Sequence, residues 1–244
     1  MLISKFFKEI TMNKILILIC VLAFASCDTT KTKGKFTITG DVANAPDQKI
    51  YLDEIYFNNE KPAVIDTSMM KNGKFTLKGI AQEEGMFRIR LEKVPENQGY
   101  LFINDMEKIP FSADYNQKDV FAVINTPANT SLRKFFNTLS SLQKQLMAEG
   151  AVNDSLAKSH FGDSLIMQES IKISYLNAQY STFVLSYADT TQSPLIALFA
   201  LGYSNNLKQE EVTATVNNIA KKFPQHKLLN ELVKNYRKDR KSVV

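Results

Sequence analysis

The sequence predicts an α+β protein in which an antiparallel β-sandwich-like domain is followed by a helical bundle. Two observations carry this prediction. Between residues 36 and 126, apolar residues alternate with polar ones, a period of two that is typical of strands with one buried face. From residue 127 to residue 241, apolar residues recur every three or four positions, which is the period of amphipathic helices.

Short alternating runs separated by turn residues indicate seven or eight strands in residues 36–126. In the clearest run, residues 87–91, three large apolar residues alternate with two arginines. Asn72-Gly73 separates two other runs, and this dipeptide is preferred in two-residue type I′ hairpin turns. Short strands at this spacing favour a small β-sandwich.

Further sequence patterns predict five helices. A stripe from Leu132 to Leu146 predicts the first helix, which we expect Gly150 to end. A second, longer helix is expected to begin near Asn153 or Asp154. Ser193-Pro194 predicts the start of a short helix whose residues 195–201 have no polar face, so we expect it at the centre of the helical part. Stripes at residues 212–223 and 228–236 predict the last two helices.

Residues 1–26 predict a signal peptide. Three lysines precede a run of ten apolar residues at positions 15–24, which is about half of the roughly 20 residues that a membrane-spanning helix needs. The run Phe24-Ala25-Ser26-Cys27 resembles a bacterial lipobox, in which the cysteine carries the lipid. We therefore expect Cys27 to be acylated and residues 27–35 to form a polar tether. A plain signal peptide and a short buried helix are the alternatives.

This organisation predicts a lipid-anchored protein of the cell envelope that faces the periplasm or the cell surface. Its partners would then be the lipid bilayer, reached through acylated Cys27, and another envelope protein. A basic stretch at residues 234–241 suits the last turn of a helix, where cations are favoured, and we expect no nucleic-acid partner outside the cytoplasm. Which membrane holds the anchor stays open.

The composition offers little for catalysis. The 244 residues include 30 basic and 25 acidic side chains, two cysteines and two histidines. Cys20 would leave with the signal peptide and Cys27 would carry lipid, so no thiol would remain for dithiol exchange or for a thiolate metal site. The sequence contains no HExxH, GxSxG or Walker phosphate-loop motif. We therefore expect no catalytic residues, no metal site and no cofactor, and a protein that is not an enzyme.

Three acidic pairs, two histidines and three aromatic residues are the remaining candidates for function. We expect the acidic pairs Asp53-Glu54, Glu83-Glu84 and Glu210-Glu211 on the solvated surface, and His160 and His226 at helix caps or on the surface. A final group is aromatic, and its members could hold a sugar ring or a partner chain, or could belong to the core. These candidate ligand-binding residues are Tyr51, Tyr56 and Phe57.

Three strand-and-turn segments resemble the family called domain of unknown function 4369. They are Phe36-Thr37-Ile38-Thr39-Gly40-Asp41-Val42, Ile65-Asp66-Thr67 and Asn72-Gly73-Lys74-Phe75-Thr76-Leu77-Lys78-Gly79. The resemblance covers about residues 35–130. It implies a β-domain of Gram-negative envelope lipoproteins, usually placed ahead of a thioredoxin-like module, with the helices that follow as a connector. The Cys-x-x-Cys pair of that module has no counterpart in this sequence.

These observations support one main functional hypothesis and two alternatives. The main hypothesis is a non-catalytic, membrane-anchored envelope lipoprotein that acts as a binding or interaction module. The first alternative is the N-terminal docking region of a truncated or split thiol-disulfide oxidoreductase, with a thioredoxin-like protein as its partner. The second is a glycan-binding envelope lipoprotein, which depends on the three aromatic residues alone.

Overall fold

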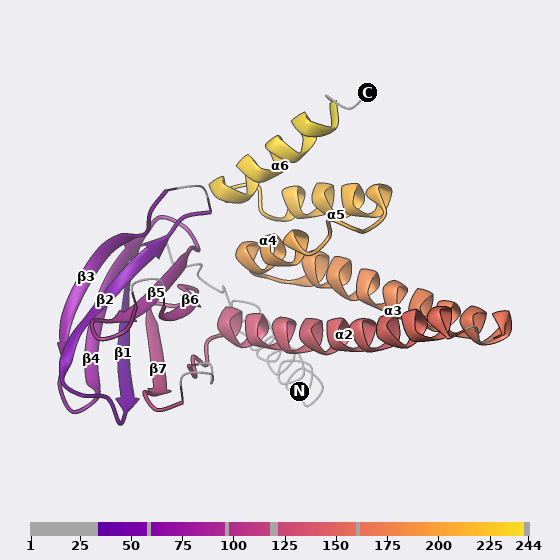
Figure 1. Cartoon of the computed structure of the whole chain (residues 1–244). Coiled ribbons are helices and arrows are strands. Elements are labelled where there is room, and N and C mark those ends of the chain that lie inside the picture. The colour runs from indigo at the N-terminus through magenta and orange to yellow at the C-terminus, as the bar shows by residue number, and fades with distance from the viewer. Residues whose placement is uncertain (1–33, 58–59, 96–97, 118–121, 160–161, 242–244) are drawn as a thin grey trace, which may run out of the picture. The chain divides into compact units, whose positions relative to one another are not determined.

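The computed structural model describes residues 34–57, 60–95, 98–117, 122–159 and 162–241, with side chains described up to residue 236. Within these residues, seven strands are followed by five helices, which confirms the predicted α+β class (Figure 1). The strands are β1 (Gly34–Ala43), β2 (Gln48–Ile55), β3 (Ala63–Met70), β4 (Lys74–Ala81), β5 (Met86–Leu91), β6 (Tyr100–Ile103) and β7 (Lys108–Asp114). The helices are α2 (Pro127–Lys158), α3 (Asp163–Thr190), α4 (Pro194–Gly202), α5 (Gln209–Lys222) and α6 (Lys227–Lys241). Sheets and helices belong to one compact unit.

The strands form two sheets that pack face to face, with strand orders β4-β1-β7 and β3-β2-β5-β6. Every pair of neighbouring strands is antiparallel except β1 and β7, which run parallel. The inward-facing residues of both sheets form one core, which includes Phe36, Phe87 and Phe102 with their rings in mutual contact. Each buried side chain of this size contributes about 2 kcal/mol, so the alternating pattern that predicts the strands also supplies their stability.

The turn at Asn72-Gly73 has the predicted conformation. Both residues have positive φ, 50° at Asn72 and 77° at Gly73, as a type I′ turn requires. A Cβ atom on Gly73 would lie 2.5 Å from the carbonyl oxygen of Val42, so only glycine fits there. The turn joins β3 to β4 and therefore connects the two sheets at one end of the sandwich.

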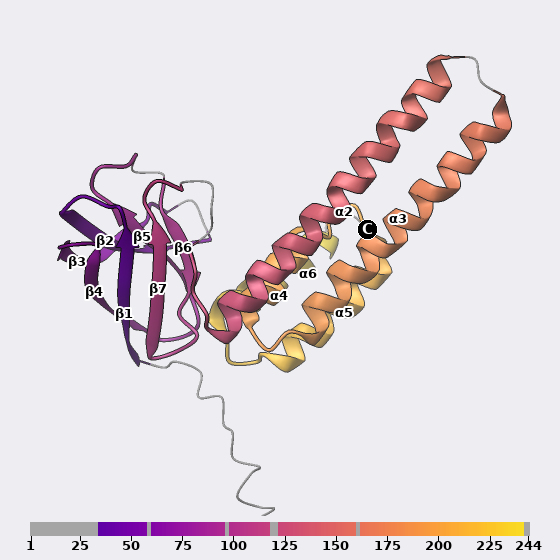
Figure 2. The same cartoon turned by 90° about the horizontal axis from the view of Figure 1, so that it is seen from below.

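Helices α2 and α3 pair as a long hairpin, and their boundaries differ from the predicted ones (Figure 2). The predicted helix end at Gly150 is wrong, because α2 continues to Lys158, and α3 begins at Asp163 rather than near Asn153. One glycine inside a helix costs about 1 kcal/mol. Packing of α2 against α3 opposes that cost, and next to Gly150 it includes the ion pair of Glu149 with Lys172, whose atoms are 2.5 Å apart.

The three shorter helices follow the predicted pattern more closely. Ser193 caps α4 as predicted, since its hydroxyl oxygen accepts a hydrogen bond from the backbone N–H of Ile196 at 3.2 Å. Leu195, Ile196 and Ala197 of α4 are fully buried, as expected for a helix without a polar face. Helix α5 ends at Lys222, just ahead of Pro224, and α6 follows. None of the helices that the structure describes is long and apolar enough to cross a membrane.

Candidate functional site

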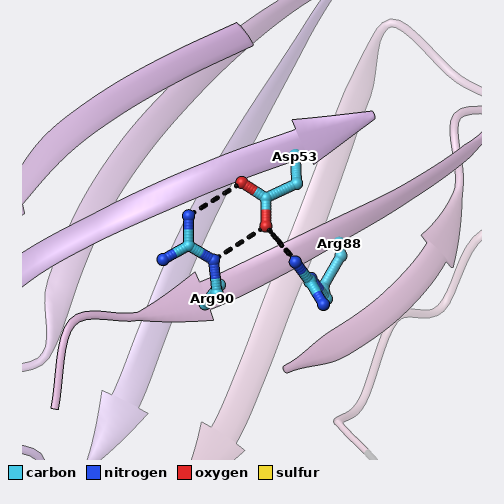
Figure 3. A network of polar contacts seen from close by, with 3 residues as sticks. All are labelled: Asp53, Arg88 and Arg90. Atoms are coloured by element: carbon cyan, nitrogen blue, oxygen red, sulfur yellow. Dashed lines mark hydrogen bonds and ion pairs between the residues drawn. The ribbon is translucent and has the colours of Figure 1, made fainter. Parts of the chain in front are cut away.

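The strongest cluster of charged side chains lies on the outer side of sheet β3-β2-β5-β6. Asp53 on β2 is opposite Arg88 on β5, and Arg90 is two residues further along β5, so all three point away from the core (Figure 3). A β-bulge at Leu52/Asp53 interrupts the pairing of β2 with β3 at this point. The alternation of arginines in β5 predicts this face, whereas the bulge leaves no signal in the sequence.

The carboxylate of Asp53 accepts four hydrogen bonds from the two arginines. Arg90 donates from Nε to Oδ2 at 2.8 Å and from Nη2 to Oδ1 at 3.1 Å. Arg88 donates to Oδ2 from Nε at 3.0 Å and from Nη2 at 2.6 Å. The side chain of Asp53 is 1% exposed, and those of Arg88 and Arg90 are 12% and 13% exposed. This is a largely desolvated ion network between two neighbouring strands.

The surroundings of Asp53 set its ionisation. Burial on its own would raise the pKa of the carboxyl group, but the hydrogen bonds and positive charges of Arg90 and Arg88 outweigh burial and hold the pKa below its usual value. Asp53 is therefore ionised at neutral pH. A carboxylate in this state cannot donate a proton as a general acid, and its lone pairs face the arginines rather than an open site. Asp53 therefore has a structural role, which is to bind the two arginines.

Each of the three predicted ligand-binding residues contacts a different neighbour. The guanidinium carbon of Arg90 lies 4.3 Å from the ring centre of Tyr51, so Tyr51 extends the Asp53 network. The hydroxyl group of Tyr56 donates to Glu54 Oε2 at 3.1 Å, and burial together with this bond raises the pKa of Tyr56. Phe57 makes an edge contact with Phe199 of α4, with ring centres 5.7 Å apart. The aromatic residues thus have three different sets of neighbours.

A second set of acidic residues joins the sheets to the helices. Asp105 follows β6, and its Oδ2 accepts from the backbone N–H of Ala128 in the first turn of α2 at 2.6 Å. Glu84 Oε1 accepts from the N–H of Leu195 at 3.3 Å and from the hydroxyl group of Ser193, at the start of α4. Glu83 accepts hydrogen bonds in the same way at the start of α6. We call Glu83, Glu84 and Asp105 the capping carboxylates.

Glu83 accepts from two backbone N–H groups at the start of α6, those of Lys227 at 2.8 Å and Leu228 at 3.3 Å. The N-termini of α2, α4 and α6 therefore each meet one carboxylate from the sheet domain. A helix N-terminus carries partial positive charge and unpaired N–H groups, so a carboxylate there is favoured on both counts. This set of contacts fixes the helices on the sheets.

The expectation that the acidic pairs are solvated surface groups is wrong for two of the three pairs. Asp53 is buried in the arginine network, and Glu83 and Glu84 are half-buried at helix N-termini. Their partners lie 35 to 145 positions away in the chain, so no local pattern could indicate them. Glu210 and Glu211 are exposed in the first turn of α5, as expected.

His226 caps α6 and also contacts the sheet domain. Its Nδ1 accepts from the backbone N–H of Leu229 at 3.2 Å, and its Nε2 lies 2.9 Å from the carbonyl oxygen of Glu84. A carbonyl oxygen only accepts, so Nε2 is the donor in this contact. The predicted capping role of His226 is thus confirmed, although the side chain is buried rather than on the surface. His160 and Cys27 lie outside the described residues.

An open groove of about 730 Å³ lies over sheet β4-β1-β7 and its edges. Its lining includes the hydroxyl groups of Thr39, Thr76 and Ser112 and the charged groups of Asp41 and Lys74. This volume falls in the range of small-molecule sites. None of the three predicted aromatic residues is among the described residues that line the groove, so the groove and the glycan hypothesis share no residue.

Exposed apolar side chains gather in the half of the α2–α3 hairpin that is far from the sheets. Met167, Ile171 and Tyr175 on α3 are 66%, 60% and 64% exposed, and Met147 on α2 is 76% exposed. Figure 2 shows the hairpin extending beyond α4, α5 and α6 at this end. Since apolar side chains at this spacing normally pack against another surface, the hairpin is the best candidate for a protein-binding region. Residues 163–190 mix polar and apolar side chains, so the sequence alone does not indicate this exposed apolar surface.

The described residues offer no group of three or more His, Cys, Asp or Glu side chains that could hold a metal ion. No curated protein and no solved structure matches the chain. A family model described as a domain of unknown function (DUF4369) matches residues 36–132, in agreement with the resemblance seen in the sequence. The seven strands and the first turn of α2 therefore form a DUF4369 domain, a domain of unknown function.

Proposed function

We propose that the chain is a non-catalytic lipoprotein of the bacterial cell envelope, anchored through acylated Cys27, that binds another protein through its α2–α3 hairpin. The observation that carries the proposal is the exposed apolar surface at the far half of that hairpin, at Met147, Met167, Ile171 and Tyr175. A soluble surface rarely leaves large apolar side chains grouped in this way unless they meet a partner.

The use of the charged groups supports a role in binding rather than catalysis. Asp53 is held ionised by Arg88 and Arg90, and the capping carboxylates accept from backbone N–H groups of three helices. The hydrogen bonds of these groups stabilise the fold. A sheet domain that fixes three helices at their N-termini is suited to presenting the hairpin in one orientation.

The anchor is tested by mass spectrometry of the mature N-terminal peptide from the native membrane. We expect an acylated Cys27 as the first residue, and release of a Cys27→Ala variant from the membrane fraction. An unmodified thiol at Cys27 would contradict the anchor. A cysteine that carries more than one acyl chain attaches the protein durably to the membrane, because each buried CH₂ group contributes about 0.8 kcal/mol.

The binding role is tested by photo-cross-linking from the hairpin. A photoreactive amino acid at Ile171 should give a discrete cross-linked protein product in intact membranes, whereas the same residue at exposed Lys134, in the other half of α2, should not. If both positions give the same products, or neither gives any, the hairpin is not a binding surface.

A second candidate function follows from the match of residues 36–132 to the DUF4369 model. The resemblance to domains that precede thioredoxin-like modules favours a role as the docking region of a thiol-disulfide oxidoreductase system, with the redox module on a separate chain. Isothermal titration of the chain with an envelope thioredoxin-like protein of the same bacterium should then show saturable binding. Absence of heat at concentrations up to about 100 μM would exclude this docking role, since a dissociation constant above that value corresponds to less than about 5.5 kcal/mol of binding free energy.

A further inference from the structure

Three lysines gather on the outer face of sheet β4-β1-β7, at the end where β1 begins. Lys78 on β4 and Lys108 on β7 lie beside Thr37 of β1, one on each side. Since neighbouring strands are about 4.8 Å apart, the backbones of the two lysines are about 10 Å from each other. Lys35 lies two residues before Thr37 and therefore on the same face. All three lysines are exposed. We call Lys35, Lys78 and Lys108 the lysine patch.

The charge of this face changes along the strands. Farther along β1, Asp41 is opposite Lys74 of β4, and Asp114 lies near the end of β7. That half of the face therefore has one positive and two negative charges. The half with the lysine patch has three positive charges, and the described strands place no acid beside them. None of the three lysines forms an ion pair with another described residue.

Two acids lie close to the patch in the chain or in space. The carboxylate of Asp66 accepts from the backbone N–H groups of Thr67 at 2.8 Å and Lys78 at 2.7 Å, so both of its oxygens are used. Glu107 precedes Lys108 in the turn ahead of β7 and is exposed. Even with Glu107 included, this end of the sheet has an excess of positive charge.

Ile80 adds an apolar side chain to the same surface. It is opposite Lys35 in the pairing of β4 with β1, and it is 64% exposed. Lysine side chains have apolar stems and charged ends, so they extend over such a neighbour and still keep their charges in a polar layer. An apolar side chain surrounded by lysines suits the boundary of a membrane, where cations meet phosphate groups and the apolar group leaves water.

The position of the patch in the chain limits its distance from the expected anchor. Gly34, the first residue of β1, is seven positions after Cys27. A segment of this length spans at most about 25 Å when it is fully extended. Once Cys27 is acylated, covalent connection alone therefore keeps Lys35 within about that distance of the lipid head groups.

We propose that the lysine patch binds anionic lipid head groups of the membrane that holds the anchor, with Ile80 inserted among them. The inference rests on the proposed anchor at Cys27 and deepens it by giving the sheet domain one orientation on the membrane. Attraction between lysines and an anionic surface extends over about 10 Å at 0.1 M salt. A short tether is therefore what brings the patch into range.

Fluorescence quenching in vesicles tests this contact. The purified acylated chain with Ile80→Cys, labelled with a fluorophore, is placed in vesicles whose lipid head groups include a quencher. The vesicles contain phosphatidylcholine alone or mixed with anionic phosphatidylglycerol. We expect stronger quenching in the anionic vesicles, and loss of the difference at roughly 1 M salt, where screening shortens the range of the attraction to about 3 Å.

Replacing the three lysines of the patch by Gln tests which charges are responsible. We expect the ratio of membrane-bound to unbound sheet domains in anionic vesicles to fall about a hundredfold, since each lysine near a membrane surface contributes about a factor of five. The matched control replaces Lys134, Lys144 and Lys221, three exposed lysines on helices, by Gln and should keep the quenching. Both variants should keep the thermal midpoint of the parent chain.

The outcomes separate this inference from the proposed anchor. Equal quenching in neutral and anionic vesicles, or unchanged quenching in a folded patch variant, overturns the inference, while an acylated Cys27 leaves the anchor in place. Equal loss of quenching in the patch variant and in its control assigns the effect to net charge and also overturns it. An unmodified Cys27 removes the anchor and this inference together.

A photoreactive amino acid at Ile80 identifies the occupant in native membranes. We expect the chain to gain the mass of a lipid. A discrete cross-linked protein in place of lipid would show that an acidic protein covers the lysine patch, and would overturn the membrane contact.

Discussion

Asp53, Arg88 and Arg90 lie on the outer face of a sheet yet are almost fully removed from water. Asp53 is opposite Arg88 and diagonal to Arg90 in the pairing of β2 with β5, so its carboxylate reaches both guanidinium groups. A shift of this pairing by one residue would turn the arginines into the core. The network and the apolar alternation of β5 therefore favour the same face of the sheet for the arginines.

The first prediction concerns the loss of this charge. Asp53→Asn keeps the shape of the side chain but leaves two guanidinium groups facing each other, and we expect the free energy of unfolding to fall by about 3 kcal/mol. Chemical denaturation followed by circular dichroism measures it. Glu107→Gln, which removes an exposed acid between β6 and β7, should change the free energy of unfolding by less than about 0.5 kcal/mol. Equal effects of the two substitutions would contradict a stabilising network.

The second prediction concerns pH. The pKa of Asp53 is lowered in the folded chain, chiefly by hydrogen bonds from Arg90 and Arg88 that outweigh the effect of burial. Its contribution to stability is thus fully present above the unfolded pKa of about 3.9 and is lost as the pH falls through the lower folded pKa. The stability difference between the parent chain and Asp53→Asn should be constant from about pH 6 to pH 5 and shrink below about pH 4. A difference that grows on acidification would contradict the sign.

The third prediction concerns Asn129, whose amide group completes the edge of β6. Its Oδ1 accepts from the N–H of Ile103 at 2.8 Å and its Nδ2 donates to the carbonyl oxygen of Ile103 at 2.7 Å. Asn129→Asp replaces the donor by an acceptor, so the buried carbonyl loses its partner at a cost of about 2 kcal/mol. Thermal unfolding should show it, while Asn137→Asp, on an exposed part of α2, should have little effect.

At the scale of elements, local patterns predict what neighbouring residues decide. The turn predicted from Asn72-Gly73 and the helix start predicted from Ser193-Pro194 are correct, because in each case the residues that interact lie within four positions of each other. Gly150 is misleading because contact of α2 with α3, more than twenty positions away, overrides a weak local preference. The capping carboxylates could not be predicted at all, since Glu83 and the N-terminus of α6 are 144 positions apart.

The fourth prediction tests one of these caps. Glu83→Ala removes the acceptor for the backbone N–H groups of Lys227 and Leu228, and we expect a loss of about 1 kcal/mol, as for other helix caps. The loss should be local. Hydrogen exchange at the first turn of α6 should become faster while exchange in β1 stays unchanged. Glu107→Ala is the matched control, and uniform acceleration over the whole chain would contradict a capping role.

At the scale of the whole molecule, the sheets and helices share an apolar contact as well as the caps. Met86 and Ile103 from the sheets pack with Ala128, Leu195 and Ile196 from the helices, and all five are buried. The change of period near residue 127 predicts where strands give way to helices, but it contains nothing about this contact. The DUF4369 match ends at residue 132, within α2, and so includes Asn129 and the cap from Asp105.

The last prediction asks whether the capping carboxylates make the two parts unfold together. With the caps and the apolar contact in place, we expect one calorimetric transition for the parent chain. Replacing Glu83 and Glu84 by Gln and Asp105 by Asn removes three charges from three helix N-termini, about 0.5–1 kcal/mol each. We expect the helices then to unfold at a lower temperature than the sheets, giving two transitions. A control that replaces Glu107 and Glu231 by Gln and Asp154 by Asn removes the same charge from exposed positions, so two transitions there would assign the effect to net charge. A single transition in the capping variant would show that the apolar contact alone couples sheets and helices.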